Sequence, residues 1–311
     1  MIAAPGSPGV PTLRSPLPAE EAAVQAVWEA SHGVDDPGGR PRGGWSVNPW
    51  ATQLCVLARG ARVIGVAAIR AESPPAEAVS ARVALDLAER TRESADVLVR
   101  ATIDMACAAE ATVVRLFLPS RAEWATTAAH SAGFVPVRSI FHMLLPAVVT
   151  YAVGNAVPSG ARIRPMRSGE EPAILAALNR NWTGTWDFVP IRAEMLERDL
   201  DGQRSGMLLA VDAADDARIL ATCHAVFDPA DQNPDGAPKA WISNLTVDPA
   251  QRGRGLGRAM LLAGLTSLRE RGAGSITLGV DAGDAKPLRL YQSIGFETVS
   301  TMEAWDKRLH A

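Results

Sequence analysis

Apolar and polar residues along this chain follow a strand-and-helix order that occurs twice. In the second half, an apolar strand from Trp241 is followed by a glycine-containing loop and then by the helical pattern A-M-L-L-A-G-L-T-S-L from Ala259. Each half reads as a short strand, a helix, a polar loop with aromatic residues, two or three strands, a long helix, a strand, a helix and a terminal strand pair. This alternation predicts an α/β fold in which helices pack on a mixed sheet.

Three sequence matches in the same order indicate that one fold is used twice. The matches pair Arg14 and its surroundings with Arg164 (offset 150), A-R-V-I-G-V-A-A-I from Ala61 with A-R-I-L-A-T-C-H-A from Ala217 (offset 156), and S-A-G-F from Ser131 with S-I-G-F from Ser293 (offset 162). Residues 1–11, rich in Pro, Gly and Ser, are expected to be a disordered lead. Residues 12–145 form the first copy, 146–160 a linker whose apolar middle could also pack or form an edge strand, and 161–311 the second copy.

The composition is that of a soluble globular protein. The chain has 311 residues, 47% hydrophobic and 21% charged, with a formal net charge of -3, so no basic excess points to nucleic acid. No run of about 18 apolar residues predicts a membrane span, and the N-terminus does not resemble a signal peptide, so we expect a cytoplasmic protein. Three widely spaced cysteines favour neither disulfides nor a metal site and are expected to be small buried hydrophobes.

The loop with glycines at 253, 255 and 257 carries the chemistry. A glycine loop at a helix N-terminus directs backbone N–H groups and the positive end of the helix dipole at one point, and missing side chains let an anion approach. Arg252, Arg254 and Arg258 add local positive charge. The loop therefore predicts a phosphate site; the alternative is a tight strand-to-helix turn without a ligand.

Together, V-D-P-A-Q-R-G-R-G-L-G-R, S-I-T-L-G-V-D-A-G-D and L-Y-Q-S-I-G-F resemble the GNAT acetyltransferase superfamily. The two-copy layout is similar to mycothiol synthases and related tandem GNAT proteins. The resemblance covers residues 240–300 closely and residues 12–145 in outline. It implies two tandem GNAT-like domains, each with a mixed, mostly antiparallel sheet flanked by helices.

The resemblance also implies acetyl-CoA as acyl donor, with no metal. The strand from Ile276 to Val280 should splay away near Gly279 and open a gap for the pantetheine arm. Tyr291 lies where the superfamily places a tyrosine beside the coenzyme sulfur, as general acid; the alternative is a packing residue. The expected coenzyme-binding residues are Leu245, Thr246, Val247, Arg252, Gly253, Arg254, Gly255, Leu256, Gly257, Arg258, Asp284 and Tyr291.

The general base is not fixed by the sequence. Mycothiol synthases tend to carry a glutamate on the strand before the loop, where this chain offers only Trp241, Ser243 and Asn244. His224 and Asp281 are candidates that would act through water, although a histidine on an apolar strand also fits a structural role. For the acceptor pocket, the aromatic residues Trp182, Trp186 and Phe188 are candidates, but tryptophans at i and i+4 fit the core face of a helix equally well.

The first copy is expected to have lost this chemistry. Projecting the offset of 162 backward places Thr91, Glu93 and Ala95 opposite the three glycines, and Ala129 opposite Tyr291. We therefore expect one N-acetyltransferase site acting on a small-molecule amine by direct attack on the thioester, in a monomer or homodimer. The alternatives are a mycothiol synthase, an acyl donor other than acetyl, and a non-catalytic acyl-CoA-binding regulatory protein.

Overall fold

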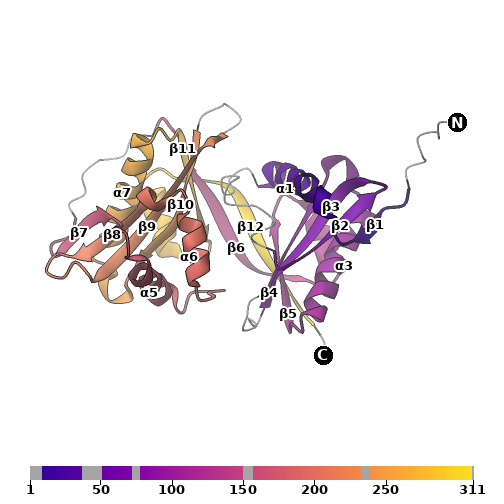
Figure 1. Ribbon diagram of the computed structural model, residues 1–311, viewed down its shortest axis with the longest axis horizontal. Helices are drawn as coiled ribbons and strands as arrows, with labels where there is room; N and C mark the ends of the chain where they lie inside the picture. The colour runs from indigo at the N-terminus through magenta and orange to yellow at the C-terminus, as the bar shows by residue number, and fades with distance from the viewer. Residues whose placement is uncertain (1–8, 37–50, 72–77, 150–156, 233–237, 310–311) are drawn as a thin grey trace. The chain divides into compact units, whose positions relative to one another are not determined.

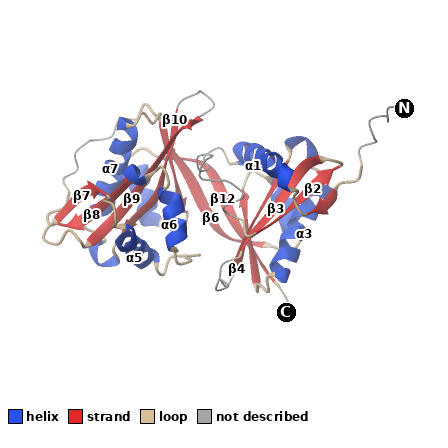
Figure 2. Cartoon of the chain, in the orientation of Figure 1, coloured by secondary structure: helices blue, strands red, loops and turns tan. Residues whose placement is uncertain are grey.

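The chain forms two compact units that are not contiguous in sequence (Figures 1 and 2). The computed structural model describes residues 9–36, 51–71, 78–149, 157–232 and 238–309. Unit 1 contains Met1–His142, Val280–Ala285 and Thr298–Ala311, and unit 2 contains Met143–Gly279 and Lys286–Glu297. In both units helices flank a mostly antiparallel mixed sheet, which confirms the predicted α/β class.

Up to its last strand, unit 1 follows the element order that the pattern predicts. Its strands pair antiparallel from β1 through β4, and β4 pairs parallel with β5. The C-terminal strand β12 (Glu297–Arg308) pairs antiparallel with β5, and Arg115 of β5 makes two 2.7 Å hydrogen bonds to Asp306. The other elements are β1 (Thr12–Arg14), η1 (Pro18–Glu20), α1 (Glu21–Asp35), β2 (Gln53–Arg59), β3 (Arg62–Arg70), β4 (Ala78–Leu85), η3 (Leu87–Glu89), α3 (Arg92–Ala108), β5 (Val113–Pro119), α4 (Glu123–Ser131) and β6 (Val135–Leu145).

Unit 2 repeats this order. Strands β7 to β10 pair antiparallel in sequence, and β10 pairs parallel with β11. One element was not predicted from the sequence: α6 (Ala193–Leu200), although A-E-M-L-E-R-D-L consists mostly of good helix formers and has its buried residues Leu196 and Leu200 one turn apart. The remaining elements are β7 (Ala161–Pro165), α5 (Glu171–Trp182), η4 (Arg204–Gly206), β8 (Met207–Asp212), β9 (Ile219–Gln232), β10 (Pro238–Val247), η5 (Pro249–Gln251), α7 (Leu256–Glu270), β11 (Ser275–Asp281) and α8 (Ala285–Gln292).

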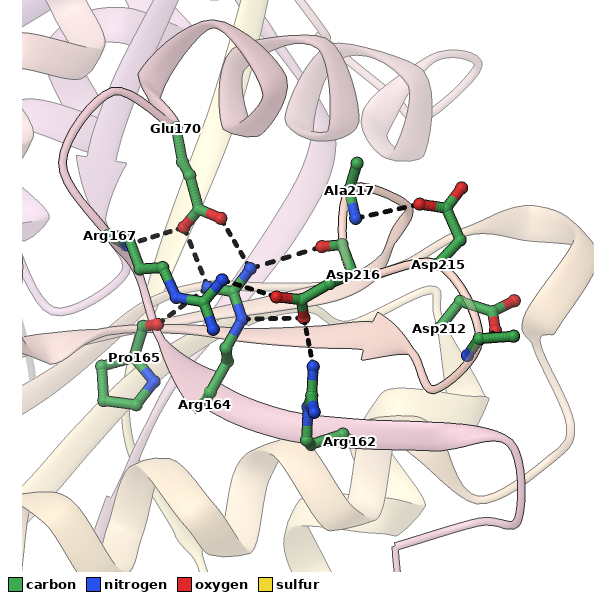
Figure 3. A network of polar contacts seen from close by, with 10 residues as sticks. Arg162, Arg164, Pro165, Arg167, Glu170, Asp212, Asp215, Asp216 and Ala217 are labelled. Carbon is green, nitrogen blue, oxygen red and sulfur yellow. Dashed lines mark hydrogen bonds and ion pairs between the residues drawn. The ribbon is translucent and has the colours of Figure 1, made fainter.

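The start of each copy carries the same polar contact. Arg14 forms two hydrogen bonds to the Glu20 carboxylate, and Arg164 forms two to that of Glu170. Each glutamate also accepts a backbone N–H three residues upstream, so the carboxylate fixes the entry to the first helix. Figure 3 shows the second copy, where Asp216 additionally joins Arg162, Arg164 and Arg167. The offset of 150 is therefore confirmed as a structural repeat.

The ends of the copies match as well. The N–H of Phe134 bonds to the carbonyl of Ala129 (3.0 Å), and the N–H of Phe296 bonds to that of Tyr291 (3.1 Å). The tight turn between each pair needs a glycine with positive φ, which Gly295 supplies in the second copy. Ala129 thus corresponds to Tyr291, as predicted. Each copy ends in one long strand rather than the predicted strand pair.

Helices cover both faces of the unit 2 sheet. Because successive side chains of a strand point to opposite faces, alternate strand residues contact different helices. On one face Met207, Leu209 and Val211 of β8 pack with buried residues of α5 and α6. On the other face Cys223 of β9 lies against Gly264 of α7, where a Cβ would meet its sulfur at 2.6 Å. Residues of β9 and β10 therefore divide between an α5 face and an α7 face, which decides what each can contact.

Two predicted segments fall partly outside the described residues. Of the expected lead 1–11, residues 1–8 lie outside, and of the expected linker 146–160, residues 150–156 lie outside. The described parts of the linker, 146–149 and 157–160, contain turns and no strand. The division of the chain into two domains at this linker stays a prediction.

Candidate active site

Strands β10 and β11 separate at the predicted point. Their parallel pairing runs from Lys239 opposite Ser275 to Ile242 opposite Leu278, and Gly279 follows as the first residue beyond it. On its other side β10 stays paired with β9 as far as Val247, with an irregular register between Ile242 and Asn244. The segment 244–247 therefore has one paired edge and one edge turned toward the gap, and the predicted splay is confirmed.

The glycine loop leads from β10 into α7 with backbone geometry that requires glycine. Gly253 and Gly255 have φ of 81° and 86°, and Gly255 is the N-cap of α7. A Cβ on Gly253 would meet no atom within 4 Å, and one on Gly255 only Pro158 Cγ at 3.9 Å. The first helical hydrogen bond, Ala259 N to Gly255 O, leaves the earlier N–H groups without a partner inside the helix. Open space therefore remains where side chains of residues 253 and 255 would lie, next to these backbone donors.

The three arginines of the loop differ in what they contact. Arg252 donates to two backbone carbonyls, those of Val247 (3.2 Å) and Asn181 (2.9 Å). Arg254 donates to the side chain of Gln251 in its own loop. Arg258 donates to Ser293 Oγ at 2.9 Å. Within 248–258, which is described throughout, arginines are the only charged groups after Asp248, so positive charge surrounds the helix N-terminus.

The matching helix of unit 1 begins differently. The C-terminal residues of the two helices, Ala108 of α3 and Glu270 of α7, are 162 positions apart. With this offset Glu93 corresponds to Gly255, as predicted. Helix α3 nevertheless starts two residues earlier in this alignment, because side chains at these positions allow helical φ whereas glycines at positive φ do not continue a helix. Thr91 Oγ1 accepts the N–H of Ser94 (3.2 Å), and Glu93 lies in the first turn. Unit 1 thus caps its own helix and adds a negative charge.

Tyr291 lies on α8 and is 7% exposed. Its ring meets that of Phe296 edge-on, with centroids 6.0 Å apart. Leu290 of the same helix faces Gly257 of α7, where a Cβ would lie 3.9 Å from its Cδ2. The ring therefore has a fixed position on the helix that packs against the glycine loop.

The base candidates lie in different surroundings. His224 is 1% exposed on β9, opposite Asn244 of β10. Asp281 accepts three hydrogen bonds from Arg138 and one from the N–H of Gly283. This pairing raises the pKa of Arg138 and occupies both carboxylate oxygens. Asp281 and Asp284 belong to the Val280–Ala285 segment of unit 1, and Asp284 directly precedes α8.

The aromatic candidates do not share one helix face. Helix α5 ends at Trp182, and Trp186 lies in the following turn, so the helix interpretation of their spacing is wrong. Trp182 packs against the core that α5 and α6 share, while Trp186 and Phe188 are half-buried in the connection. The side chain of Asn179 holds the far end of this connection through two bonds to Ile191. The three aromatic residues thus belong to one segment, residues 182–191, whose two ends are both held by the C-terminal turn of α5.

A buried polar chain joins α5 to the strand beside the gap and was not anticipated. Asn181 Nδ2 donates to Thr246 Oγ1 (2.9 Å), which also bonds to Thr222 Oγ1 (2.8 Å), and all three residues are buried. Thr246, expected to contact the coenzyme arm, therefore directs its side chain at α5. The spacing of Asn181 from Ile174 and Leu178, at i+7 and i+3, places it on the core face of α5 and could have revealed it.

The described part of the chain also bears on the expectations for metal ligands, membrane-spanning helices and cysteines. No group of three or more His, Cys, Asp or Glu there could hold a metal ion, and no helix in those ranges is long and apolar enough to cross a membrane. All three cysteines are free thiols, and burial raises the pKa of Cys223 to about 12. The expectation that all three are buried is wrong for Cys107, which is exposed, and for Cys55, which is half-buried.

Comparisons with known proteins point to one family. Residues 172–296 match the acetyltransferase (GNAT) family. A protein named mycothiol acetyltransferase from Thermobispora bispora is 28% identical over 292 residues, covering 90% of this chain and 93% of that protein. One of the same name from Saccharopolyspora erythraea is 29% identical over 265 residues, covering 80% and 83%.

Solved structures share the fold over the whole chain. A GCN5-related N-acetyltransferase from Sphaerobacter thermophilus superposes with a TM-score of 0.71 at 20% identity, covering 97% of this chain and 96% of that chain. A tandem GNAT protein from the clavulanic acid biosynthesis pathway gives 0.69 at 16% identity, covering 96% and 99%. At these identities the likeness shows the fold, and it confirms the predicted tandem GNAT architecture.

Proposed function

We propose that this chain, whose residues 172–296 match the acetyltransferase (GNAT) family, transfers an acetyl group from acetyl-CoA to the amine of a small molecule. The observation that carries this proposal is the contrast between the two helix N-termini. That of α7 is open, without a side-chain cap and flanked by arginines, whereas that of α3 is capped by Thr91 and carries Glu93 in its first turn. One coenzyme per chain, held by unit 2, follows from the contrast.

The chain's own groups fit the coenzyme. The N–H groups of the first turn of α7 suit the pyrophosphate, and Arg254 and Arg258 can add charge-assisted hydrogen bonds. The edge of β10 at residues 244–247 that faces the gap suits the amide groups of the pantetheine arm, because backbone N–H and C=O groups there have no strand partner on that side. Leu245 and Val247 face α7, and Thr246 contributes backbone contacts.

The proposed reaction is direct acyl transfer. The amine nitrogen bonds to the thioester carbonyl carbon, the C–S bond breaks, and the sulfur leaves as a thiolate that takes the phenol proton of Tyr291. The amine loses one proton to a base. His224 is nearly fully buried and Asp281 is bound by Arg138, so water is the first acceptor of that proton in either case. We therefore expect the transfer to depend on a neutral amine.

A thiol-release assay tests the proposal. Purified protein is mixed with acetyl-CoA and a panel of amino acids, aminoglycosides and amino sugars, and free coenzyme A thiol is measured, with acetylated product identified by mass spectrometry. We expect amine-dependent release with at least one class and none with the Gly255→Asp variant described in the Discussion. Binding of acetyl-CoA without acetylation of any amine would instead favour a non-catalytic acyl-CoA-binding regulator.

A second candidate is the activity that the relatives' name describes. The Thermobispora bispora mycothiol acetyltransferase aligns with nearly the whole chain, which favours a shared acceptor. The strand before the loop argues against it, since Trp241, Ser243 and Asn244 supply no carboxylate. Adding the acceptor of the mycothiol acetyltransferases to the panel separates the two: it should be acetylated much faster than all other amines if the activity is shared.

A further inference from the structure

We propose that Arg252 is a positioning residue that joins the coenzyme loop to the C-terminus of α5, rather than a ligand of the coenzyme phosphates. The inference rests on the proposed function, because it assigns the loop to coenzyme binding. The Arg252 guanidinium is placed between two backbone carbonyls: Nε donates to Val247 O at 3.2 Å and Nη2 to Asn181 O at 2.9 Å. It thereby bridges the last residue of β10 and the second-last residue of α5.

The carbonyl of Asn181 is one of those that a helix C-terminus leaves without an intrahelical partner. A guanidinium there satisfies the carbonyl and interacts favourably with the negative end of the helix dipole. A second arginine, Arg180, places its Nε 3.3 Å from Asp248 Oδ2, at the start of the coenzyme loop. Below these contacts, Asn181 is bound to Thr246. The end of α5, the end of β10 and the loop therefore form one joined structure.

The C-terminal turn of α5 holds both ends of the segment that contains the aromatic candidates. Residues 182–191 leave α5 at Trp182 and return to it where Ile191 exchanges two hydrogen bonds with the Asn179 side chain (2.7 and 2.9 Å). Both ends of the segment are thus anchored on the last turn of α5. A change at Arg252 therefore reaches Trp186 and Phe188 through this turn.

Arg254 provides the contrast. It lies two residues away in the same loop and is exposed like Arg252, but it donates to Gln251 of that loop instead of bridging to another element. Arg254 can therefore turn toward a bound phosphate without breaking a contact to α5. Arg252 would first have to break its hydrogen bonds to the carbonyls of Val247 and Asn181. A lysine at position 252 keeps the charge but cannot span both carbonyls, because its ammonium is a point donor rather than a planar fork.

This arrangement predicts that coenzyme binding orders the segment 182–191. Hydrogen exchange measured by mass spectrometry, on the full chain with and without saturating coenzyme A, reads this out without any amine acceptor. The variants are Arg252→Lys and Arg252→Gln, and the matched control is Arg254→Lys. Exchange in the β8–β9 core and the melting temperature report whether each variant is folded.

Without ligand, amides in 182–191 should exchange about tenfold faster in both Arg252 variants, equal to about 1.4 kcal/mol, and at the wild-type rate in Arg254→Lys. Coenzyme A should then slow exchange there in the wild type and in Arg254→Lys, and much less in Arg252→Lys.

The inference is overturned if Arg252→Lys exchanges like the wild type in 182–191, or if lysine restores a coenzyme affinity that glutamine removes, since charge alone would then explain the residue. A wild-type protein that binds no coenzyme A would contradict the proposed function. The exchange comparison without ligand would still decide what Arg252 holds in place.

Discussion

Replacing Gly255 by aspartate tests whether the α7 N-terminus holds the coenzyme pyrophosphate. Position 255 has φ of 86° and open space, so an added side chain is limited by backbone strain and not by a clash. Asp and Asn adopt this left-handed conformation more readily than other side chains. A carboxylate about 5 Å from one pyrophosphate charge repels it by about 3 kcal/mol at an effective dielectric constant of about 20. That energy corresponds to roughly 200-fold weaker binding.

Gly255→Asn is the matched control, because it carries the same backbone strain and nearly the same volume without the charge. Calorimetric titration with acetyl-CoA should show the Asp variant at least about 100-fold weaker than the Asn variant, at similar melting temperatures. Aspartate is preferred to glutamate at position 255. The corresponding residue of unit 1, Glu93, lies in a helix and therefore does not show that a glutamate can adopt positive φ at this position. Equal affinities of the Asp and Asn variants would refute the assignment of this loop to the pyrophosphate.

Two further predictions concern Tyr291 and His32. Tyr291→Phe should lower kcat by about 10- to 100-fold with little change in acetyl-CoA affinity, and the loss should shrink for donors with a more acidic thiol; wild-type kcat with every donor would make Tyr291 a packing residue. In unit 1, burial and the positive charge of Arg82 lower the pKa of His32 to about 4 from 6.5. Between these values the unfolded chain binds more protons at this position, so the melting temperature should fall as the pH is lowered through that window. His32→Gln should flatten this dependence, and an unchanged slope would show that another group causes it.

The sequence predicted the parts of the site that depend on backbone geometry. Glycines at positive φ, such as Gly253 and Gly255, leave direct marks in the residue pattern because few other residues tolerate that conformation. The end of strand pairing before Gly279 was expected from the family resemblance, and a glycine there fits a break in the sheet. The repeat was detectable for a similar reason: Arg14 with Glu20 and Arg164 with Glu170 fix the same chain entry by the same contacts.

Side-chain direction was harder to predict than position. The side chain of Thr246 bonds to Asn181 and that of Arg252 to two backbone carbonyls, and the residue pattern revealed neither contact. Coenzyme contacts of these two residues stay a prediction. Whether a residue faces one side of a strand or the other depends on which helix covers that face, and this comes from long-range packing. The helix interpretation of Trp182 and Trp186 was wrong for another reason. Their i, i+4 spacing fits one helix face, but α5 ends at Trp182, before Trp186 is reached.

Calorimetric titration of the wild-type chain with acetyl-CoA tests the central claim most directly. The helix N-terminus of unit 2 is open, whereas that of unit 1 is capped by Thr91 and carries Glu93 in its first turn. We therefore predict one coenzyme per chain, with the site lost in Gly255→Asp and kept when Thr91 is replaced by alanine. Two sites of similar affinity, or a single site that survives Gly255→Asp, would contradict it.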